Sequence, residues 1–207
     1  MRFLFDLDSP ILQFLGRLGD LVILNVVFIL SCIPVFTIGA ANAALYAVVF
    51  RMDTEREEPL LRTYFRAFRE NFRQGSAVWL VLGLFGVASC LNMVRFSEIG
   101  GTLGYLLFLI AMAVMVVCVF MFTYAFPLMS QFRNSTRNTL KNALLLSAAN
   151  LPRSMAVAVI NCFPWALMVL NLYTFIRLSF LWLALYFAAA AYFNSRVLKK
   201  VFDALVK

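Results

Sequence analysis

Two sets of side chains repeat at helical intervals between residues 59 and 75, where they could build a binding surface. The sets are the basic Arg62, Arg66, Arg69 and Arg73 and, one residue earlier each time, the apolar Leu61, Phe65, Phe68 and Phe72. One residue corresponds to a rotation of about 100° on an α-helix, so the two stripes lie side by side. Aromatic rings in such a stripe can enter the acyl boundary of a bilayer while guanidinium groups reach lipid phosphates. We therefore predict an amphipathic cytoplasmic helix over 59–75.

This helix has more than one possible use. A plain interfacial anchor is the simplest interpretation, and docking to another protein through Arg62–Arg73, which includes Asn71, is the sharper one. We expect no nucleic-acid partner. Arg133, Arg137 and Lys141 form a second basic stripe, which we interpret as a solvated face or a contact with lipid headgroups.

A second candidate site surrounds a proline inside an apolar run. Pro34, Thr37 and Gly39 interrupt the run, and Asn42 and Tyr46 follow one helical turn apart. Proline breaks helices because it lacks a backbone donor. Polar groups within a membrane either join helices or contact a solute. We predict that these five residues form a packing or gating motif in the membrane. The asparagines of the apolar runs are interpreted as links between helices: Asn25, Asn92, Asn161 and Asn171.

The sequence contains few residues of the types that enzymes use for catalysis. There is no histidine, which removes the commonest metal ligand and acid–base group. The four cysteines lie in apolar runs and form no CxxC pair, which indicates buried thiols: Cys32, Cys90, Cys118 and Cys162. No Walker A, GxGxxG or HExxH motif occurs. We expect no enzymatic activity, no metal site and no cofactor.

The composition indicates that the elements carrying these residues are built for lipid. Of the 207 residues, 63% are hydrophobic and 14% are charged, whereas soluble domains have about 45–50% and about 25%. A soluble domain of this length could not bury so much apolar surface. We therefore predict an all-α, polytopic helical membrane protein, with one transmembrane domain over 1–207 and amphipathic helices at the cytoplasmic interface.

Five apolar stretches reach the roughly 20 residues that a transmembrane helix needs. They are residues 21–50, 76–94, 103–127, 155–173 and 178–195. The first stretch is longer than the others, because a single helix of that length would reach about 45 Å across a core of about 30 Å. Pro34 lies near its middle. The stretch either crosses once as a kinked helix, which we prefer, or enters and returns as two half-helices.

The N-terminal residues 1–19 are predicted to form an interfacial helix. Ser9 followed by Pro10 resembles a helix cap with proline at the first helical position. Phe14, Leu15 and Leu18 then fall on one helical face.

The basic residues orient the predicted helices. Fourteen of the eighteen lie in three segments, namely 51–75, 128–154 and the tail 196–207. Five crossings place these segments on one side, which the positive-inside rule makes cytoplasmic. We predict a protein of the bacterial cell membrane with its C-terminus in the cytoplasm. The N-terminus lies outside if residues 21–50 cross once, and inside if they return.

Two stretches carry a resemblance to a known family. One is IPVFTIGAA at 33–41, continuing to Tyr46 and Arg51, and the other is FRAFRENFRQ at 65–74. Together they resemble the YesL family of bacterial integral membrane proteins, a family of unknown function, with which length and span layout also agree. Its members are often encoded beside carbohydrate ABC importers. The resemblance implies an accessory or regulatory partner of sugar uptake.

The chain does not look like an importer permease itself. Those permeases carry a cytoplasmic loop with an acidic start and a central Asp-Gly, whereas residues 128–154 contain no Asp, Glu or Gly. We expect a protein that contacts the lipid bilayer and the components of a sugar ABC transporter. The alternatives are an independent small-solute transporter or channel, and a lipid-binding scaffold. The sequence does not indicate an oligomeric state.

Overall fold

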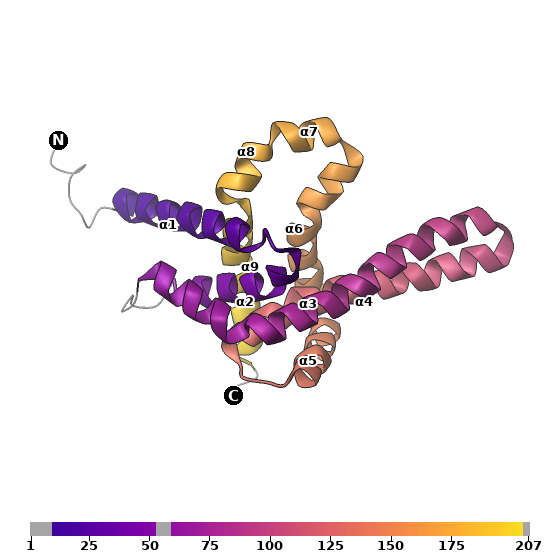
Figure 1. Ribbon diagram of the computed structural model, residues 1–207, viewed down its shortest axis with the longest axis horizontal. Helices are drawn as coiled ribbons and strands as arrows, with labels where there is room; N and C mark the ends of the chain where they lie inside the picture. Colours follow the sequence, from indigo (N-terminus) through magenta and orange to yellow (C-terminus); the bar gives the residue numbers. More distant parts are fainter. Residues whose placement is uncertain (1–9, 53–58, 205–207) are drawn as a thin grey trace.

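The structure, a computed structural model, describes residues 10–52 and 59–204, and within these ranges the chain forms helices and no β-strand. The α-helices are α1 (Pro10–Ser31), α2 (Ile38–Val49), α3 (Leu60–Ile99), α4 (Gly101–Gln131), α5 (Thr136–Ala149), α6 (Leu151–Leu170), α7 (Leu172–Arg177), α8 (Ser179–Leu181) and α9 (Phe187–Phe202). A 3₁₀ turn, Val35–Thr37, precedes α2, and a π-helical segment, Trp182–Tyr186, precedes α9. Figure 1 shows α3 and α4 extending as a long hairpin from the other helices.

Five of the described helices are long and apolar enough to cross a membrane. They are Leu12–Ser31, Leu60–Ile99, Gly101–Gln131, Leu151–Leu170 and Ser179–Phe202. Large apolar side chains lie exposed along the hairpin, such as Leu84 at 71% and Leu103 at 66%. An exposed apolar surface of this size is unfavourable in water but suits contact with lipid acyl chains. The all-α prediction is confirmed, and these helices have the length and composition of membrane spans.

The first predicted stretch, 21–50, is divided between two helices. α1 ends at Ser31 and α2 begins at Ile38. Thr37 closes the break, because its Oγ1 lies 2.5 Å from the carbonyl oxygen of Ser31 and 2.6 Å from that of Pro34, so its one proton is shared between them. Figure 1 shows α2 running back against the direction of α1. The preferred single kinked crossing is therefore not confirmed, and the arrangement resembles the alternative in which the chain enters and returns.

Two predicted interfacial helices are parts of longer helices. Residues 10–19 form the first part of α1, while residues 1–9 lie outside the described residues. The predicted helix 59–75 continues into the span that was predicted to begin at residue 76, so that α3 has 40 residues, or about 60 Å. No proline occurs within α3, and a helix tolerates single glycines at a cost of about 1 kcal/mol each. The basic stripe thus belongs to a helix that also has an apolar half.

The C-terminal tail is also mostly helical. α9 continues to Phe202, beyond the predicted boundary at residue 196. Its last turn carries Lys199 and Lys200, where basic groups interact favourably with the helix dipole. Residues 205–207 of the predicted tail lie outside the described residues.

Two glycines form the tight turn between α3 and α4. Gly100 and Gly101 have φ angles of +67° and +65°, which only glycine adopts without strain. This turn folds α4 directly back along α3. α4 remains a helix through Pro127 and ends at Gln131.

The small helix α2 lies at the centre of the packing. Ten of its twelve residues are buried, half of them alanine, and it packs against α1, α3, α4 and α9. Its start crosses α3 so closely that a Cβ atom on Gly39 would lie 2.0 Å from the carbonyl oxygen of Gly75. Small residues allow helix backbones to approach in this way in membrane proteins.

Hydrogen bonds from side chains stabilise the irregular C-terminal helices. Asn25 of α1 is fully buried, and its Nδ2 donates to the carbonyls of Trp182 at 3.1 Å and Leu183 at 2.7 Å. Its Oδ1 accepts a bond of 2.9 Å from the backbone N–H of Ala188. A π-helical turn leaves backbone groups without their usual α-helical partners, and Asn25 satisfies three of them. The prediction that Asn25 links helices is confirmed.

Candidate functional site

The first part of α3 has three distinct faces. One face is buried in the molecule and includes Thr63, Tyr64, Ala67 and Gly75. The predicted docking residues lie on the other two faces. Arg62, Phe65, Arg66, Arg69, Phe72 and Arg73 are exposed, whereas Phe68 and Asn71 are half-buried. The amphipathic pattern is therefore real, but the helix is anchored by a third face that packs against protein rather than lipid.

The aromatic side chains form a continuous row along α3. The ring centroids of Phe68 and Phe72 lie 5.7 Å apart, and those of Phe72 and Phe36 lie 6.4 Å apart. Phe36 belongs to the turn before α2, where the neighbouring Val35 is 66% exposed. We call Val35, Phe36, Phe65, Phe68 and Phe72 the aromatic ridge. It combines residues from both sequence motifs into one apolar surface that can contact acyl chains or another protein.

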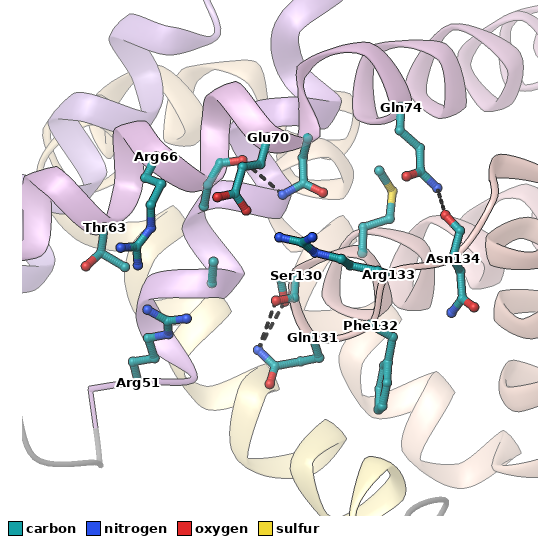
Figure 2. Close-up of a pocket in the computed structure, with 14 residues that line it drawn as sticks. Arg51, Thr63, Arg66, Glu70, Gln74, Ser130, Gln131, Phe132, Arg133 and Asn134 are labelled. Atoms are coloured by element: carbon teal, nitrogen blue, oxygen red, sulfur yellow. Dashed lines mark hydrogen bonds between the residues drawn. The ribbon is translucent and has the colours of Figure 1, made fainter.

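A polar cavity of about 690 Å³ also lies along the first turns of α3, and no residue of the aromatic ridge lines it. Its walls come from the end of α2, the first turns of α3, and the end of α4 with the segment that follows. Figure 2 shows the guanidinium groups of Arg51, Arg66 and Arg133 around this space, with the Glu70 carboxylate among them. Among the described residues, the lining thus has three basic side chains and one acidic side chain, and we call this space the arginine cavity.

One hydrogen-bonded side chain fixes the far wall of the arginine cavity. Gln74 Nε2 donates to the carbonyl of Asn134 at 2.9 Å and to Thr139 Oγ1 at 3.0 Å (Figure 2 shows the first bond). The first bond connects α3 to the segment between α4 and α5, and the second connects it to α5 itself. The segment ends at Ser135, whose hydroxyl accepts a bond from the Asn138 N–H and caps α5. The segment that carries Arg133 is therefore held by α4 on one side and by the start of α5 on the other.

The five residues of the predicted in-membrane motif do not converge on one site. Pro34 and Thr37 form the break between α1 and α2, and Gly39 forms the close contact with α3. Asn42 Nδ2 donates to the carbonyl of Ile38 in its own helix at 3.0 Å. Tyr46, one turn after Asn42 on α2, is buried and accepts a bond from Asn194 of α9 in a polar cluster. Pro34 and Thr37 thus shape the break before α2, Gly39 permits the close crossing of α2 and α3, and gating stays a prediction.

That polar cluster joins three helices. Asn194 of α9 donates through Nδ2 to Asn161 Oδ1 on α6 at 2.8 Å and, over 3.4 Å, to Tyr46 Oη on α2. Asn194 is fully buried, and its Oδ1 has no hydrogen-bond partner in the described part of the chain. Buried polar groups are normally satisfied, so this oxygen is unusual. Asn171 has a different role from the predicted link, because it caps α7 by accepting from the Thr174 N–H at 3.0 Å.

The ends of three helices meet beside the arginine cavity. The ring of Phe202, at the end of α9, lies 5.8 Å from the ring of Phe50 and 5.8 Å from that of Phe132. Phe50 follows α2 and Phe132 follows α4. A residue within or next to each of the three predicted basic segments therefore lies in this one cluster.

Sequence reasoning missed two features of this region. Arg133 was assigned to a different basic segment from Arg51 and Arg66, and nothing in the spacing of the three predicted that they line one cavity. The Tyr46–Asn161–Asn194 cluster depends on residues from three helices, which periodicity within one helix cannot reveal. Among the described residues, no three His, Cys, Asp or Glu side chains lie close enough to hold a metal ion.

Comparison with known proteins finds similarity to a family of unknown function. The family described as "Protein of unknown function, DUF624" matches residues 21–93, a range that contains both sequence motifs. The chain is 28% identical over 138 residues to the uncharacterized protein YteU of Bacillus subtilis (strain 168), a match that covers 65% of this chain and 60% of the length of YteU. No solved structure matches the chain. The sequence is thus similar to a family of unknown function.

Proposed function

We propose that this chain is a YesL-type integral membrane protein that acts through contact with other membrane proteins, as an accessory or regulatory partner of an ABC-type carbohydrate uptake system. The link to sugar uptake comes from the family resemblance. The observation that carries the contact role is the exposed arginine and phenylalanine surface of α3. Its opposite face is already occupied by the rest of the molecule, so this surface is the part that remains for a partner.

The docking surface is held in a defined orientation. Gly75 contacts the backbone of α2, and Gln74 ties α3 to the segment that follows α4. A preorganised surface loses less conformational entropy when it binds. Arginines next to aromatic side chains also have the composition of interface hot spots. These features favour a protein partner over a purely lipid-facing anchor.

The proposed orientation places this surface in the cytoplasm, with the C-terminus on the same side. The support is the concentration of basic residues in 51–75, 128–154 and 196–207, since such segments stay on the cytoplasmic side. Residues 128–154 lack the acidic residues and the glycine of a permease coupling loop. Contact through α3 with a transporter subunit is therefore a better proposal than direct coupling to an ATPase through α5.

Affinity purification from bacterial membranes in mild detergent tests this proposal. The test variant Phe65→Ala/Arg69→Gln removes one residue of each stripe outside the arginine cavity. Phe180→Ala/Arg177→Gln is the matched control, because both of its residues are also exposed. We expect wild type and control to recover sugar-transporter components and the test variant to recover at least about tenfold less, since hot-spot truncations cost about 2 kcal/mol or more.

Two results of this purification would count against the proposal. One is that wild-type protein recovers no transporter component under conditions that preserve known transporter complexes. The other is that the two double variants recover equal amounts. If partners are unaffected but substitutions of the α3 arginines by glutamine weaken binding to anionic liposomes, a lipid-binding scaffold is the better description.

The alternative function is that of a small-solute transporter or channel. The observation that favours it is the buried Asn194 Oδ1, which has no partner in the described part of the chain. The chain also has a break at Pro34, a proline within α6 at Pro164 and a π-helical segment before α9. Interrupted helices often surround solute sites in transporters. Flux into liposomes that contain only this purified protein, abolished by Asn194→Ala, would favour transport. Asn42 is a weaker candidate than the sequence suggests, because its side chain bonds to its own helix.

A further inference from the structure

The arginine cavity contains a charge arrangement that the docking surface does not explain. Arg51 follows α2, Arg66 lies on α3 and Arg133 follows α4. Only Arg66 belongs to the amphipathic stripe. Three guanidinium groups from three elements face a space that has one carboxylate, that of Glu70, among its described lining residues. The surplus of basic groups is therefore a property of the tertiary fold.

Guanidinium groups and phosphate groups match in charge and in shape. Each guanidinium is planar and carries five N–H donors, so it can bond to two oxygens of a phosphate while it keeps other partners. This matters because Arg51 and Arg66 make further interactions of their own. A phosphate monoester carries about −1.5 to −2 charges at neutral pH, which is close to the excess of basic over acidic groups among the described lining residues.

The size and neutral lining of the cavity also suit a phosphoester. Its volume of about 690 Å³ falls within the range of about 300–1,000 Å³ for small-molecule sites, so the organic part of a phosphoester has room beside its phosphate. Ser130 and Gln131 offer a hydroxyl and an amide for that part. Glu70 can accept hydrogen bonds from hydroxyl groups and would repel a second anion.

We propose that the arginine cavity binds one phosphate group, carried either by a small soluble phosphoester or by the headgroup of an anionic phospholipid. The guanidinium groups of Arg51, Arg66 and Arg133 hold its oxygens, and the bonds from Gln74 keep the Arg133 segment in place. The site would let the binding of a charged metabolite or a lipid stabilise the junction of α2, α3 and α4. This inference does not depend on the identity of a protein partner.

A simpler explanation competes with this one. Arg51 and Arg133 each follow the C-terminus of a helix, where basic side chains stabilise the last carbonyls and the negative end of the dipole. That role requires no anion in the cavity. It predicts that replacing Arg133 lowers stability by the same amount whether phosphate is present or absent.

Thermal unfolding of the purified full chain in a neutral detergent separates the two explanations. The soluble probes are inorganic phosphate and glycerol 3-phosphate, measured against chloride at equal ionic strength. The lipid probe is phosphatidylglycerol, measured against phosphatidylcholine. A ligand that binds only the folded chain raises the melting temperature as its concentration exceeds Kd. We expect at least one probe to stabilise wild-type protein, and the arm that does so identifies the source of the phosphate.

The variants locate the binding. Arg133→Gln is expected to raise the Kd of the stabilising probe at least about tenfold, because one charged hydrogen bond is lost. Arg137→Gln, an exposed arginine outside the cavity lining, is expected to bind as wild type does. Arg133→Lys keeps the charge without the planar guanidinium. It replaces the glutamine variant in this test if that variant does not fold. It is expected to bind the probe at least several-fold more weakly than wild type.

Three results would overturn the proposal. The first is that no phosphate probe stabilises wild-type protein more than its control does, which requires no variant. The second is that the Arg133 and Arg137 variants respond equally to the probe. The third is that Arg133→Gln lowers stability equally with and without the probe, as the capping explanation predicts. None of these results bears on recovery of transporter components, so failure here is distinguishable from failure of the proposed docking role.

Discussion

Single polar side chains replace the backbone hydrogen bonds that interrupted helices lose in this molecule. Pro164 has no N–H, so the carbonyl of Ile160, four residues earlier, loses its usual helical donor. Tyr186 Oη donates to this carbonyl at 2.6 Å. Asn25 does the same for the π-helical segment that contains Tyr186. The irregular helices are therefore compatible with an apolar environment, where an unsatisfied carbonyl is costly.

The pairing of Pro164 and Tyr186 leads to a prediction about coupled substitutions. Tyr186→Phe removes the donor to Ile160, and we expect it to lower the free energy of unfolding by about 0.5–1.5 kcal/mol. In a Pro164→Ala background the alanine N–H can donate to the same carbonyl. Tyr186→Phe should then cost less than half as much, whatever the effect of Pro164→Ala alone. Denaturant titration in detergent measures all four variants of this cycle.

The control for this cycle is Tyr173→Phe, which removes the same hydroxyl from a side chain that is 73% exposed. It should change stability by less than about 0.5 kcal/mol. If Tyr186→Phe costs the same in both backgrounds, the hydroxyl stabilises the protein in some way other than by replacing the bond that proline removes.

At the scale of elements, the crossing of α2 and α3 is the contact that leaves least room for change. A Cβ atom on Gly39 would lie 2.0 Å from the Gly75 carbonyl oxygen, and one on Gly75 would lie 2.8 Å from the Ala40 nitrogen. Both obstacles are backbone atoms, which cannot rotate away as a side chain can. The two helices would have to separate, and α2 would lose the contacts that place it at the centre of the fold.

We expect Gly39→Ala and Gly75→Ala each to destabilise the protein by about 3 kcal/mol or more, at the upper end of overpacking effects. Gly83→Ala is the matched control on the same helix as Gly75, because a Cβ atom there meets nothing within 4 Å. It should be neutral or stabilising by up to about 1 kcal/mol, since alanine favours helices. Fluorescence-detected size-exclusion chromatography after heating reports the fraction of intact protein. Equal behaviour of all three variants would contradict the close crossing.

The element scale also shows what the sequence could predict. Helical periodicity within one segment located both stripes of α3, because spacing alone determines which residues share a face. It could not show that the same helix has a third, buried face, since Thr63 and Ala67 become buried only when other helices pack against α3. Nor could it divide residues 21–50 correctly, because the break depends on bonds from Thr37 to two carbonyls. The arginine cavity combines residues from separate segments, so no local pattern reveals it.

At the scale of the whole molecule, the directions of the helices bear on the side of the N-terminus. Figure 1 shows α1 and α3 running in the same direction, whereas α2, which lies between them in the chain, runs in the opposite direction. α4 then returns along α3, and the end of α9 meets the ends of α2 and α4. If α2 counts as a return pass, the number of passes is even. Both termini then lie on one side, together with the three basic segments.

Cysteine accessibility in intact cells tests this arrangement. The parent is a variant whose four native cysteines are replaced by alanine, and single cysteines are then introduced one at a time. Asn138→Cys and Lys200→Cys lie at exposed positions of α5 and α9, and Thr102→Cys lies at the turn of the hairpin. Ser9→Cys precedes α1 in the sequence. A membrane-impermeant maleimide is applied before and after the cells are permeabilised.

We expect Thr102→Cys to react in intact cells, and Ser9→Cys, Asn138→Cys and Lys200→Cys to react only after permeabilisation. If Ser9→Cys also reacts in intact cells while the other three sites behave as expected, residues 21–50 cross once, which was the preferred interpretation of the sequence. Labelling of Asn138→Cys or Lys200→Cys would overturn the orientation itself. In that case the α3 surface would face away from the cytoplasm, and the proposed role in sugar uptake would need a partner on the other side of the membrane.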